Sequence, residues 1–293
     1  MDSFVVHAFS ENADGGNPAG VVFLPESLQV SETQMQELAA DLNFSETAFI
    51  RKQRERSFFI RFFTPVCEVP LCGHATIASF SWLRQKGMIG DGFYRMVTIE
   101  TELEVEVSGD TVWSRMDTPV LEEAIDENMR ERVCRAYGLK ESDLSEQFPM
   151  RIVKAGLRDL HVCVRSREAL LRAVQNAAEV SDISKELDVV GVHMSCPVLS
   201  SEKRIHGEKK GDAVTAYCSN YAPRCGIEEE CATGTANAGL TFYLYGKGAV
   251  KEEQVNCFLQ GEHMGRPSRV YSKVRRDKDE ISVGIGGQAV ICE

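Results

Sequence analysis

The sequence predicts an α+β protein of two similar domains, each a sheet wrapped around a central helix. Its 293 residues are long for one compact core, so two domains are expected. Strand and helix patterns interleave in both halves. LCGHATIASFSWLRQKG (71–87) and ECATGTANAGLTFYLYGKG (230–248) also align at a constant offset, with Cys72 matching Cys231 and Thr76 matching Thr235. We therefore expect a duplicated unit related by a pseudo-twofold axis.

The first half contains clear local signals for strands and helices. Ser31 and Gln34 form a capping-box pattern that begins a helix over 31–43. An apolar helix over 74–87 stops at Gly87, and a hairpin turns at Gly109-Asp110. Strands are expected at 4–10, 20–24, 47–52, 58–64, 94–101, 102–109 and 111–116.

The second half repeats this alternation. Helices are expected at 130–139, 167–179 and 233–246, and strands at 150–156, 161–165, 188–194, 213–219, 255–261, 268–275 and 281–292. The boundary is expected near 118–127, which gives an N-terminal domain over 1–120 and a C-terminal domain over 121–293. The sequence leaves open a return of the last strand to the first domain.

Composition narrows the classes of function. A net charge of −11 and a pI near 5.2 argue against a nucleic-acid or anionic-membrane surface. The chain has no run of about 18 apolar residues and no secretory start, so a cytoplasmic protein with reduced thiols is expected. None of the ten cysteines forms a C-x2-C pair, so no metal site is predicted. No glycine-rich phosphate loop or Schiff-base lysine context indicates a cofactor.

The candidate catalytic residues lie near the N-termini of two predicted helices. Residues 228–239, EEECATGTANAG, place three carboxylates and a thiol before one predicted central helix, and Cys72 precedes the other. Each start offers unpaired backbone N–H groups that suit a carboxylate ligand. Small residues there would let that ligand approach the backbone: Gly73, Ala75, Ala232 and Gly234. We expect a site for a small acid in the cleft between the domains.

Five stretches carry a family resemblance. They are AFSENADGGNPAGVVF (8–23), NFSETAFI (43–50), IRFFTPVCEVPLCGHATIA (60–78), EEECATGTANAG (228–239) and LQGEHMGRPSRVYS (259–272). Together they resemble the PhzF-like (phenazine biosynthesis protein) family of cofactor-independent isomerases, which share the diaminopimelate epimerase fold. The resemblance spans the chain and implies a homodimer that acts on a small carboxylic acid.

The resemblance also implies roles for individual residues. Glu46, in S-E-T-A-F, would be the acid/base that moves a proton between two positions of the substrate. Phe44 and Phe49 flank it, a partly buried setting suited to acid–base catalysis. The substrate-binding residues would be Asn17, Gly73, His74, Gly234 and Thr235. From spacing alone, an idle helix-terminal carboxylate is the favoured interpretation of Glu46, and His74 could equally be a structural histidine.

The second site departs from the family pattern. The family shows E-D-P-A-T-G-S-A where this chain has E-E-C-A-T-G-T-A, so Glu230 replaces an aspartate and Cys231 a proline. Glu230 is expected to act as a second acidic group. Alternatively, Glu228, Glu229 and Glu230 only complement a helix dipole, an effect of roughly 0.3–1 kcal/mol each.

Two other functions remain open on the sequence. Cys72 and Cys231 resemble the paired thiols of diaminopimelate epimerase and the proline racemases, in which one thiolate takes the α-proton and the other thiol donates one. A helix N-terminus lowers a thiol pKa, which suits both positions to this two-thiol chemistry. The other alternative is a non-catalytic protein that binds a small acid or a protein partner.

Overall fold

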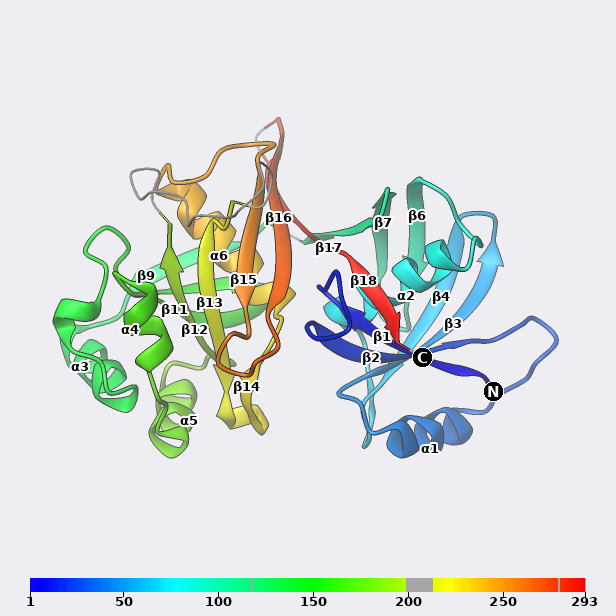
Figure 1. Ribbon diagram of the computed structural model, residues 1–293, viewed down its shortest axis with the longest axis horizontal. Coiled ribbons are helices and arrows are strands. Elements are labelled where there is room, and N and C mark those ends of the chain that lie inside the picture. Colours follow the sequence, from blue (N-terminus) through cyan, green and yellow to red (C-terminus); the bar gives the residue numbers. More distant parts are fainter. Residues whose placement is uncertain (117, 199–212, 279, 293) are drawn as a thin grey trace. The chain divides into compact units, whose positions relative to one another are not determined.

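The computed structural model describes residues 1–116, 118–198, 213–278 and 280–292 (Figure 1). The chain divides into two compact units. Unit 1 comprises Met1–Arg115 and Gly286–Glu293, and unit 2 comprises Met116–Ile285. Both contain a mixed sheet and few helices. No helix in the described ranges combines the length and apolar character needed to cross a membrane.

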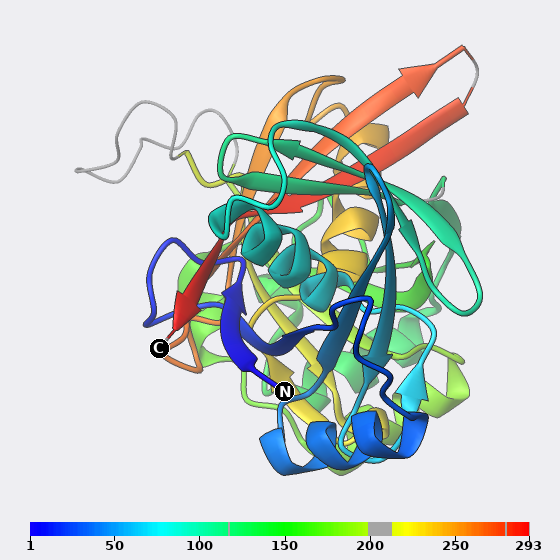
Figure 2. The same ribbon diagram turned by 90° about the vertical axis from the view of Figure 1, so that its right-hand side faces the viewer.

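Unit 1 is built on a sheet that joins the two ends of the chain. Strand β1 (Ser3–Ala8) pairs antiparallel with both β2 (Asn17–Phe23) and β18 (Ala289–Cys292). Figure 2 shows the red C-terminal strand beside the blue first strand. The sheet continues from β2 through β3 (Thr47–Arg54), β4 (Ser57–Phe63), β6 (Gly92–Val97), β7 (Glu102–Ser108) and β8 (Thr111–Met116), with the short β5 (Glu68–Val69) also paired to β4.

Two helices pack on this sheet in different ways. Helix α2 (Gly73–Gln85) contacts β1, β2, β3 and β18, and every residue from His74 to Leu83 is buried. A helix that is buried all round must be surrounded by its own unit, as this one is. Helix α1 (Glu32–Leu42) covers β3 and β4 from outside, and Ser31 forms the predicted capping box with Gln34.

The strands of unit 2 also pair in both parallel and antiparallel directions. Their order is β9 (Val120–Ala124), β10 (Arg151–Ala155), β11 (Leu157–Cys163), β12 (Gly191–Pro197) and β13 (Ala216–Ala222), after which β13 pairs with both β14 (Ile227–Glu230) and β15 (Val255–Gln260). Strand β16 (Ser268–Asp277) follows β15, and β17 (Glu280–Gly287) leads out of the unit.

The two faces of the unit 2 sheet differ in polarity. One face is apolar, and Leu160, Val192 and Tyr221 belong to a buried core that also includes residues of α3 (Glu127–Ala136), α4 (Arg167–Arg172) and α5 (Ala177–Glu186). Because side chains alternate along a strand, the neighbouring positions point to the other face. There many of the buried side chains are polar, and they include Asp159, His161, His193, Ser195 and Asn220.

The polar face packs against helix α6 (Gly234–Gly246), which is buried from Ala236 to Leu244 except at Phe242. A Cβ on Gly239 would lie 2.8 Å from His161 Nε2, so this helix position requires glycine for close approach. His161 and His193 are fully buried and contact each other edge to face. Burial lowers the pKa of His161 well below its usual value and that of His193 to about 4, so both rings are neutral at pH 7.

One local prediction was wrong. The helix expected over 167–179 is two helices, because the chain turns extended at Ala173 and Asn176 begins a new helix by accepting from the Glu179 N–H. The acidic run before α6, for which no strand was predicted, forms the strand β14 and pairs with β13.

The two aligned segments, 71–87 and 230–248, are less equivalent in the structure than the match of Cys72 with Cys231 suggests. Cys72 is the residue immediately before α2, whereas Ala232 and Thr233 stand between Cys231 and the first residue of α6. The offset that aligns the two cysteines therefore does not align the starts of the two helices.

Candidate active site

Glu46 lies immediately before strand β3. Helix α1 ends at Asn43, whose left-handed backbone (φ 53°) turns the chain toward β3. The Glu46 carbonyl accepts a hydrogen bond of 3.0 Å from the Gly20 N–H of the neighbouring strand β2. This anchors the backbone, while the side chain remains 21% exposed and can reach a ligand.

Three polar side chains meet beside Glu46. His74 Nε2 lies 3.3 Å from Glu46 Oε2 and 3.3 Å from Ser45 Oγ. On its other nitrogen, His74 Nδ1 lies 3.4 Å from Cys72 Sγ. Glu46, Cys72 and His74 thus form one cluster, although Glu46 comes from a segment distant in the sequence.

The electrostatics of this cluster favour a neutral imidazole. Burial lowers the pKa of His74, and the nearby Glu46 carboxylate only partly offsets this effect. A neutral ring that carries its proton on Nε2 can accept at Nδ1 from the Cys72 thiol. Glu46 is then not neutralised by an imidazolium and can act as a base.

The N-terminus of α2 lies at the same cluster and is open. No side chain of the described residues caps α2 or α6, whereas α1, α3, α4 and α5 are capped by Ser31, Asp126, Ser166 and Asn176. A Cβ on Gly73 would meet no atom within 4 Å, so space is present above the first turn. Uncapped N–H groups beside free space suit an anionic ligand. Asn17, the first residue of β2, is 6% exposed.

The three carboxylates before α6 point in different directions. Glu228 is exposed, and Glu229 Oε1 lies 3.5 Å from His263 Nδ1. Glu230 Oε2 accepts a hydrogen bond of 2.5 Å from the Thr233 hydroxyl at the start of α6. Only Glu230 is therefore held at the α6 N-terminus, where Gly234 and Thr235 form the first turn.

Gln260 holds the backbone of Glu230 in place, a role that sequence reasoning missed. It is fully buried, and its Nε2 donates to the Glu230 carbonyl at 2.7 Å and to Thr233 Oγ1 at 3.0 Å. Its Oε1 accepts from Asn237 Nδ2 at 2.8 Å and from the Thr233 N–H at 3.2 Å. One side chain thus ties β14 to α6 through four hydrogen bonds.

Asp159 is a second residue that sequence reasoning missed. It is 4% exposed on β11, and its carboxyl accepts a hydrogen bond from the Gly191 N–H. Burial raises the pKa of Asp159 to about 7, and the negative charge of Glu230 contributes in the same direction. Unit 2 therefore contains a carboxyl that still binds a proton near neutral pH, electrostatically coupled to Glu230.

We expect Asp159→Asn to stabilise the protein at pH 8. In the unfolded chain this carboxyl ionises near its ordinary pKa of 3.8, whereas in the folded state it stays protonated up to about pH 7. Its contribution to stability is thus present below pH 3.8 and is lost as pH rises to 7. At pH 8 the shifted pKa of Asp159 lowers the free energy of unfolding by roughly 4 kcal/mol at most. Asparagine does not ionise, so it removes this loss, and its side-chain oxygen can still accept from the Gly191 N–H. Urea unfolding of both proteins at pH 4 and pH 8 measures the difference.

Asp182→Asn is the matched control, because this carboxyl of unit 2 is 65% exposed and forms an exposed ion pair with Lys185. It should change the unfolding midpoint little at either pH. An Asp159→Asn variant less stable than wild type at pH 8 would show that the ionised carboxylate has an essential partner.

The surroundings of Cys231 work against formation of a thiolate. Its residue is 3% exposed, and burial raises the pKa of the thiol, with Arg266 nearby only partly offsetting this. The sequence-based expectation of a lowered pKa at this position is therefore wrong. Cys72 is also buried, at 8% exposure, but it contacts His74 directly.

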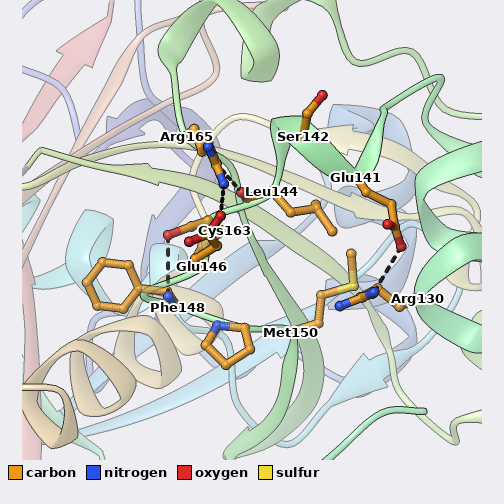
Figure 3. Close-up of a pocket in the computed structure, with 11 residues that line it drawn as sticks. Arg130, Glu141, Ser142, Leu144, Glu146, Phe148, Met150, Cys163 and Arg165 are labelled. Atoms are coloured by element: carbon orange, nitrogen blue, oxygen red, sulfur yellow. Dashed lines mark hydrogen bonds and ion pairs between the residues drawn. The ribbon is translucent and has the colours of Figure 1, made fainter. Parts of the chain in front are cut away.

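A separate hollow of about 550 Å³ lies in unit 2 (Figure 3). Its cations are already paired, since Arg130 contacts Glu141 at 2.9 Å and Arg165 contacts Glu146. Phe148 and Met150 contribute apolar surface to its wall. None of the site residues expected from the sequence lines it, and its paired charges do not favour an acid.

Comparison with known proteins identifies the family. Residues 6–293 match the family model described as phenazine biosynthesis-like protein, PhzC-PhzF. The chain belongs to the PhzF family.

Several relatives of this PhzF-family chain are named as isomerases. An uncharacterized isomerase of Clostridium acetobutylicum is 32% identical over 99% of this chain and 94% of that protein. The trans-2,3-dihydro-3-hydroxyanthranilate isomerase of Pseudomonas chlororaphis is 29% identical over 98% of this chain and 95% of that protein. These relatives place the chain among the isomerases of the family.

Solved structures agree on the fold of this PhzF-family chain. The PhzF-family phenazine biosynthesis protein of Bacillus anthracis matches with a TM-score of 0.85 at 23% identity, covering 100% of this chain and 98% of that one. A probable proline racemase from Agrobacterium radiobacter matches with a TM-score of 0.57 at 12% identity, covering 99% of this chain and 92% of that one. The fold is therefore also similar to that of the racemases, as expected from the sequence.

Proposed function

We propose that this protein is a cofactor-independent isomerase that moves a proton on a small carboxylic acid, with Glu46 as the acid/base. The observation that carries the proposal is the contact of the Glu46 carboxylate with a buried, neutral His74 beside the uncapped N-terminus of α2. Family membership supports isomerisation as the reaction class, and the geometry of the cluster supports Glu46 as the acid/base.

The chemistry of the cluster follows from its geometry. The substrate carboxylate binds the free N–H groups of the first turn of α2, where Gly73 leaves space. Glu46 removes a proton from one carbon and returns it to another, so that no net proton is gained or lost. His74 Nε2 lies 3.3 Å from the carboxylate and helps to position it, while Ser45 and Cys72 orient the ring.

Unit 2 supplies the second acidic group in this proposal. Glu230 is fixed by Thr233 and Gln260 at the N-terminus of α6, with Gly234 and Thr235 as substrate-binding positions. We retain the expectation that Glu46 and Glu230 act on one substrate in an interdomain cleft. The pseudo-twofold relation, the homodimer and the cytoplasmic location also stay predictions.

The proposal is tested by proton exchange in heavy water. The protein is incubated with trans-2,3-dihydro-3-hydroxyanthranilate, the compound named for the Pseudomonas relative, and with a panel of small amino, hydroxy and cyclic unsaturated acids. NMR then locates any deuterium. Wild type and Cys231→Ser are compared, because a two-thiol enzyme cannot work without Cys231 whereas a Glu46 enzyme can.

We expect exchange on an unsaturated acid that persists within a few-fold in Cys231→Ser. Exchange at an α-carbon that disappears in Cys231→Ser would contradict the Glu46 mechanism and establish two-thiol racemisation. The raised pKa of Cys231 favours the first result, because a protonated thiol is a poor base.

A further inference from the structure

The side-chain amide of Gln260 has one possible orientation, because backbone groups of known polarity bind both of its ends. Its Nε2 lies 2.7 Å from the Glu230 carbonyl, which can only accept, and its Oε1 lies 3.2 Å from the Thr233 N–H, which can only donate. An amide turned by 180° would place oxygen against oxygen and nitrogen against nitrogen. The nitrogen of Gln260 therefore faces the Glu230 carbonyl, and its oxygen faces the residue before α6.

Asn237 holds Gln260 in this orientation from within α6. Its Nδ2 lies 2.8 Å from the Thr233 carbonyl and 2.8 Å from Gln260 Oε1, and it donates to both oxygens. Gln260 and Asn237 are fully buried, and both belong to unit 2. A buried amide that is held by several hydrogen bonds cannot rotate without leaving polar groups unpaired, which is costly.

The orientation of Gln260 decides where the hydroxyl hydrogen of Thr233 points. Gln260 Nε2 carries two hydrogens, of which one is donated to the Glu230 carbonyl and the other to Thr233 Oγ1 at 3.0 Å. Because the hydroxyl accepts from Gln260, its own single hydrogen is left for another acceptor, and Glu230 Oε2 lies 2.5 Å away. The hydrogen bonds thus run in one direction, from Asn237 through Gln260 and Thr233 to the Glu230 side chain.

The length of the last hydrogen bond in this chain agrees with an ionised acceptor. Hydrogen bonds from a hydroxyl to a carboxylate measure about 2.5–2.7 Å, and the distance of 2.5 Å from Thr233 Oγ1 to Glu230 Oε2 falls in this range. A donor that is fixed in place stabilises the ionised form of the carboxylate that it binds. Glu230 is thus held deprotonated and in one orientation by a chain of donors that begins at Asn237.

We propose that Gln260 is a positioning residue of the active site, which directs the Thr233 hydroxyl at Glu230 and so presents this carboxylate to the substrate deprotonated and in one orientation. The catalytic use of Glu230 rests on the proposed function, whereas the direction of the hydrogen bonds does not. The two parts are therefore measured separately.

Titration of Glu230 tests the direction of the hydrogen bonds and needs no substrate. Protein labelled with carbon-13 at the glutamate carboxyls is followed by NMR over the pH range in which it stays folded, and the Glu230 signal is assigned by its absence in Glu230→Gln. Thr233→Val removes the hydroxyl but keeps the backbone N–H that binds Gln260. We expect Glu230 to take up its proton at a pH higher by about one unit or more in this variant.

Thr233→Ser is the matched control for the titration, because it keeps the hydroxyl and should leave the Glu230 titration as in wild type. The nearby titratable groups Asp159 and Cys231 remain in all of these proteins, so their influence cancels in the comparison. Glu230 titrating identically in Thr233→Val and wild type would overturn the proposal, since the hydroxyl would then not donate to it.

Kinetics test whether this positioning serves the reaction. Gln260→Glu keeps the shape of the side chain and an oxygen for Asn237, but it lacks the nitrogen with two hydrogens. We expect Thr233→Val and Gln260→Glu each to lower kcat by about tenfold with a smaller change in KM, and Thr233→Ser to restore most of the rate. Because Gln260 acts through Thr233, the double variant should be about as fast as Thr233→Val alone.

The double variant separates positioning from a purely structural role. If Gln260 only ties β14 to α6 through backbone groups, the losses in kcat multiply, and this result would overturn the proposal. Gln254→Glu, an exposed change just before β15, is the control and should alter neither kcat nor the Glu230 titration. Should Gln260→Glu fail to fold, Thr233→Val and Thr233→Ser still decide, since both keep Gln260. A fully active Glu46→Gln enzyme would reject the proposed function and leave the titration result standing.

Discussion

Replacing Glu46 with glutamine is expected to lower the turnover number by about 10³-fold or more, since general acid–base catalysis contributes on this scale. Glutamine preserves the shape of the side chain but cannot accept and return a proton. Its contact with His74 can persist, so substrate affinity should change much less than turnover. Steady-state kinetics and deuterium incorporation on the active acid measure the two effects.

Stability distinguishes a catalytic role of Glu46 from a structural one. Glu46 Oε2 lacks a hydrogen-bond partner among the described residues, so Glu46→Gln should leave the urea midpoint close to that of wild type. Glu37→Gln, an exposed change on helix α1 of the same unit, should affect neither stability nor turnover. A Glu46→Gln enzyme within tenfold of wild-type turnover would show that another group moves the proton.

Replacing Gly191 with alanine is expected to unfold unit 2 or to destabilise it by several kcal/mol. The added Cβ would lie 2.1 Å from the backbone oxygen of Tyr221 on the next strand. Gly191 begins β12, which is paired to β11 and to β13, so its backbone cannot move away without breaking the ladder on one side. Overpacking against backbone belongs to the most damaging kinds of substitution.

Urea unfolding followed by circular dichroism measures this loss. Gly246→Ala, at the end of α6, is the control, because its Cβ would meet no atom within 4 Å. There alanine should be neutral or stabilising by up to about 1 kcal/mol. If Gly191→Ala matched wild type, β12 would have to pair differently from the register found here.

The parts of the fold that follow from local patterns could be predicted. The capping box at Ser31 and the hairpin at Gly109-Asp110 depend on neighbouring residues, and the structure contains both. The acidic strand β14 could not, because three consecutive glutamates show no alternation and are typical of no strand. Its conformation is set by pairing with β13, a tertiary interaction that overrides local preference.

The candidate site likewise combines features that follow from the sequence with features that depend on tertiary contacts. The contact of Glu46 with His74 could be anticipated only through the family resemblance, since the spacing of the two residues follows no helical or strand period. Asp159 and Gln260 were missed because their importance arises from strand register. Asp159 faces Gly191 across a parallel pair, and Gln260 reaches Glu230 and Thr233 from β15. An isolated Asp or Gln in a strand pattern gives no signal of such contacts.

The pairing of β18 with β1 has a consequence for biosynthesis. During translation, β1 emerges first, but its second neighbour is made only when residues 289–292 leave the ribosome. Until then β1 is an edge strand, and α2 lacks its contact with β18 and the hydrogen bond from Gln85 to the Ala289 carbonyl. Unit 2 is synthesised in between. The unit that begins first on the ribosome is thus the one completed last, and the nascent chain must carry an unfinished N-terminal sheet throughout its elongation.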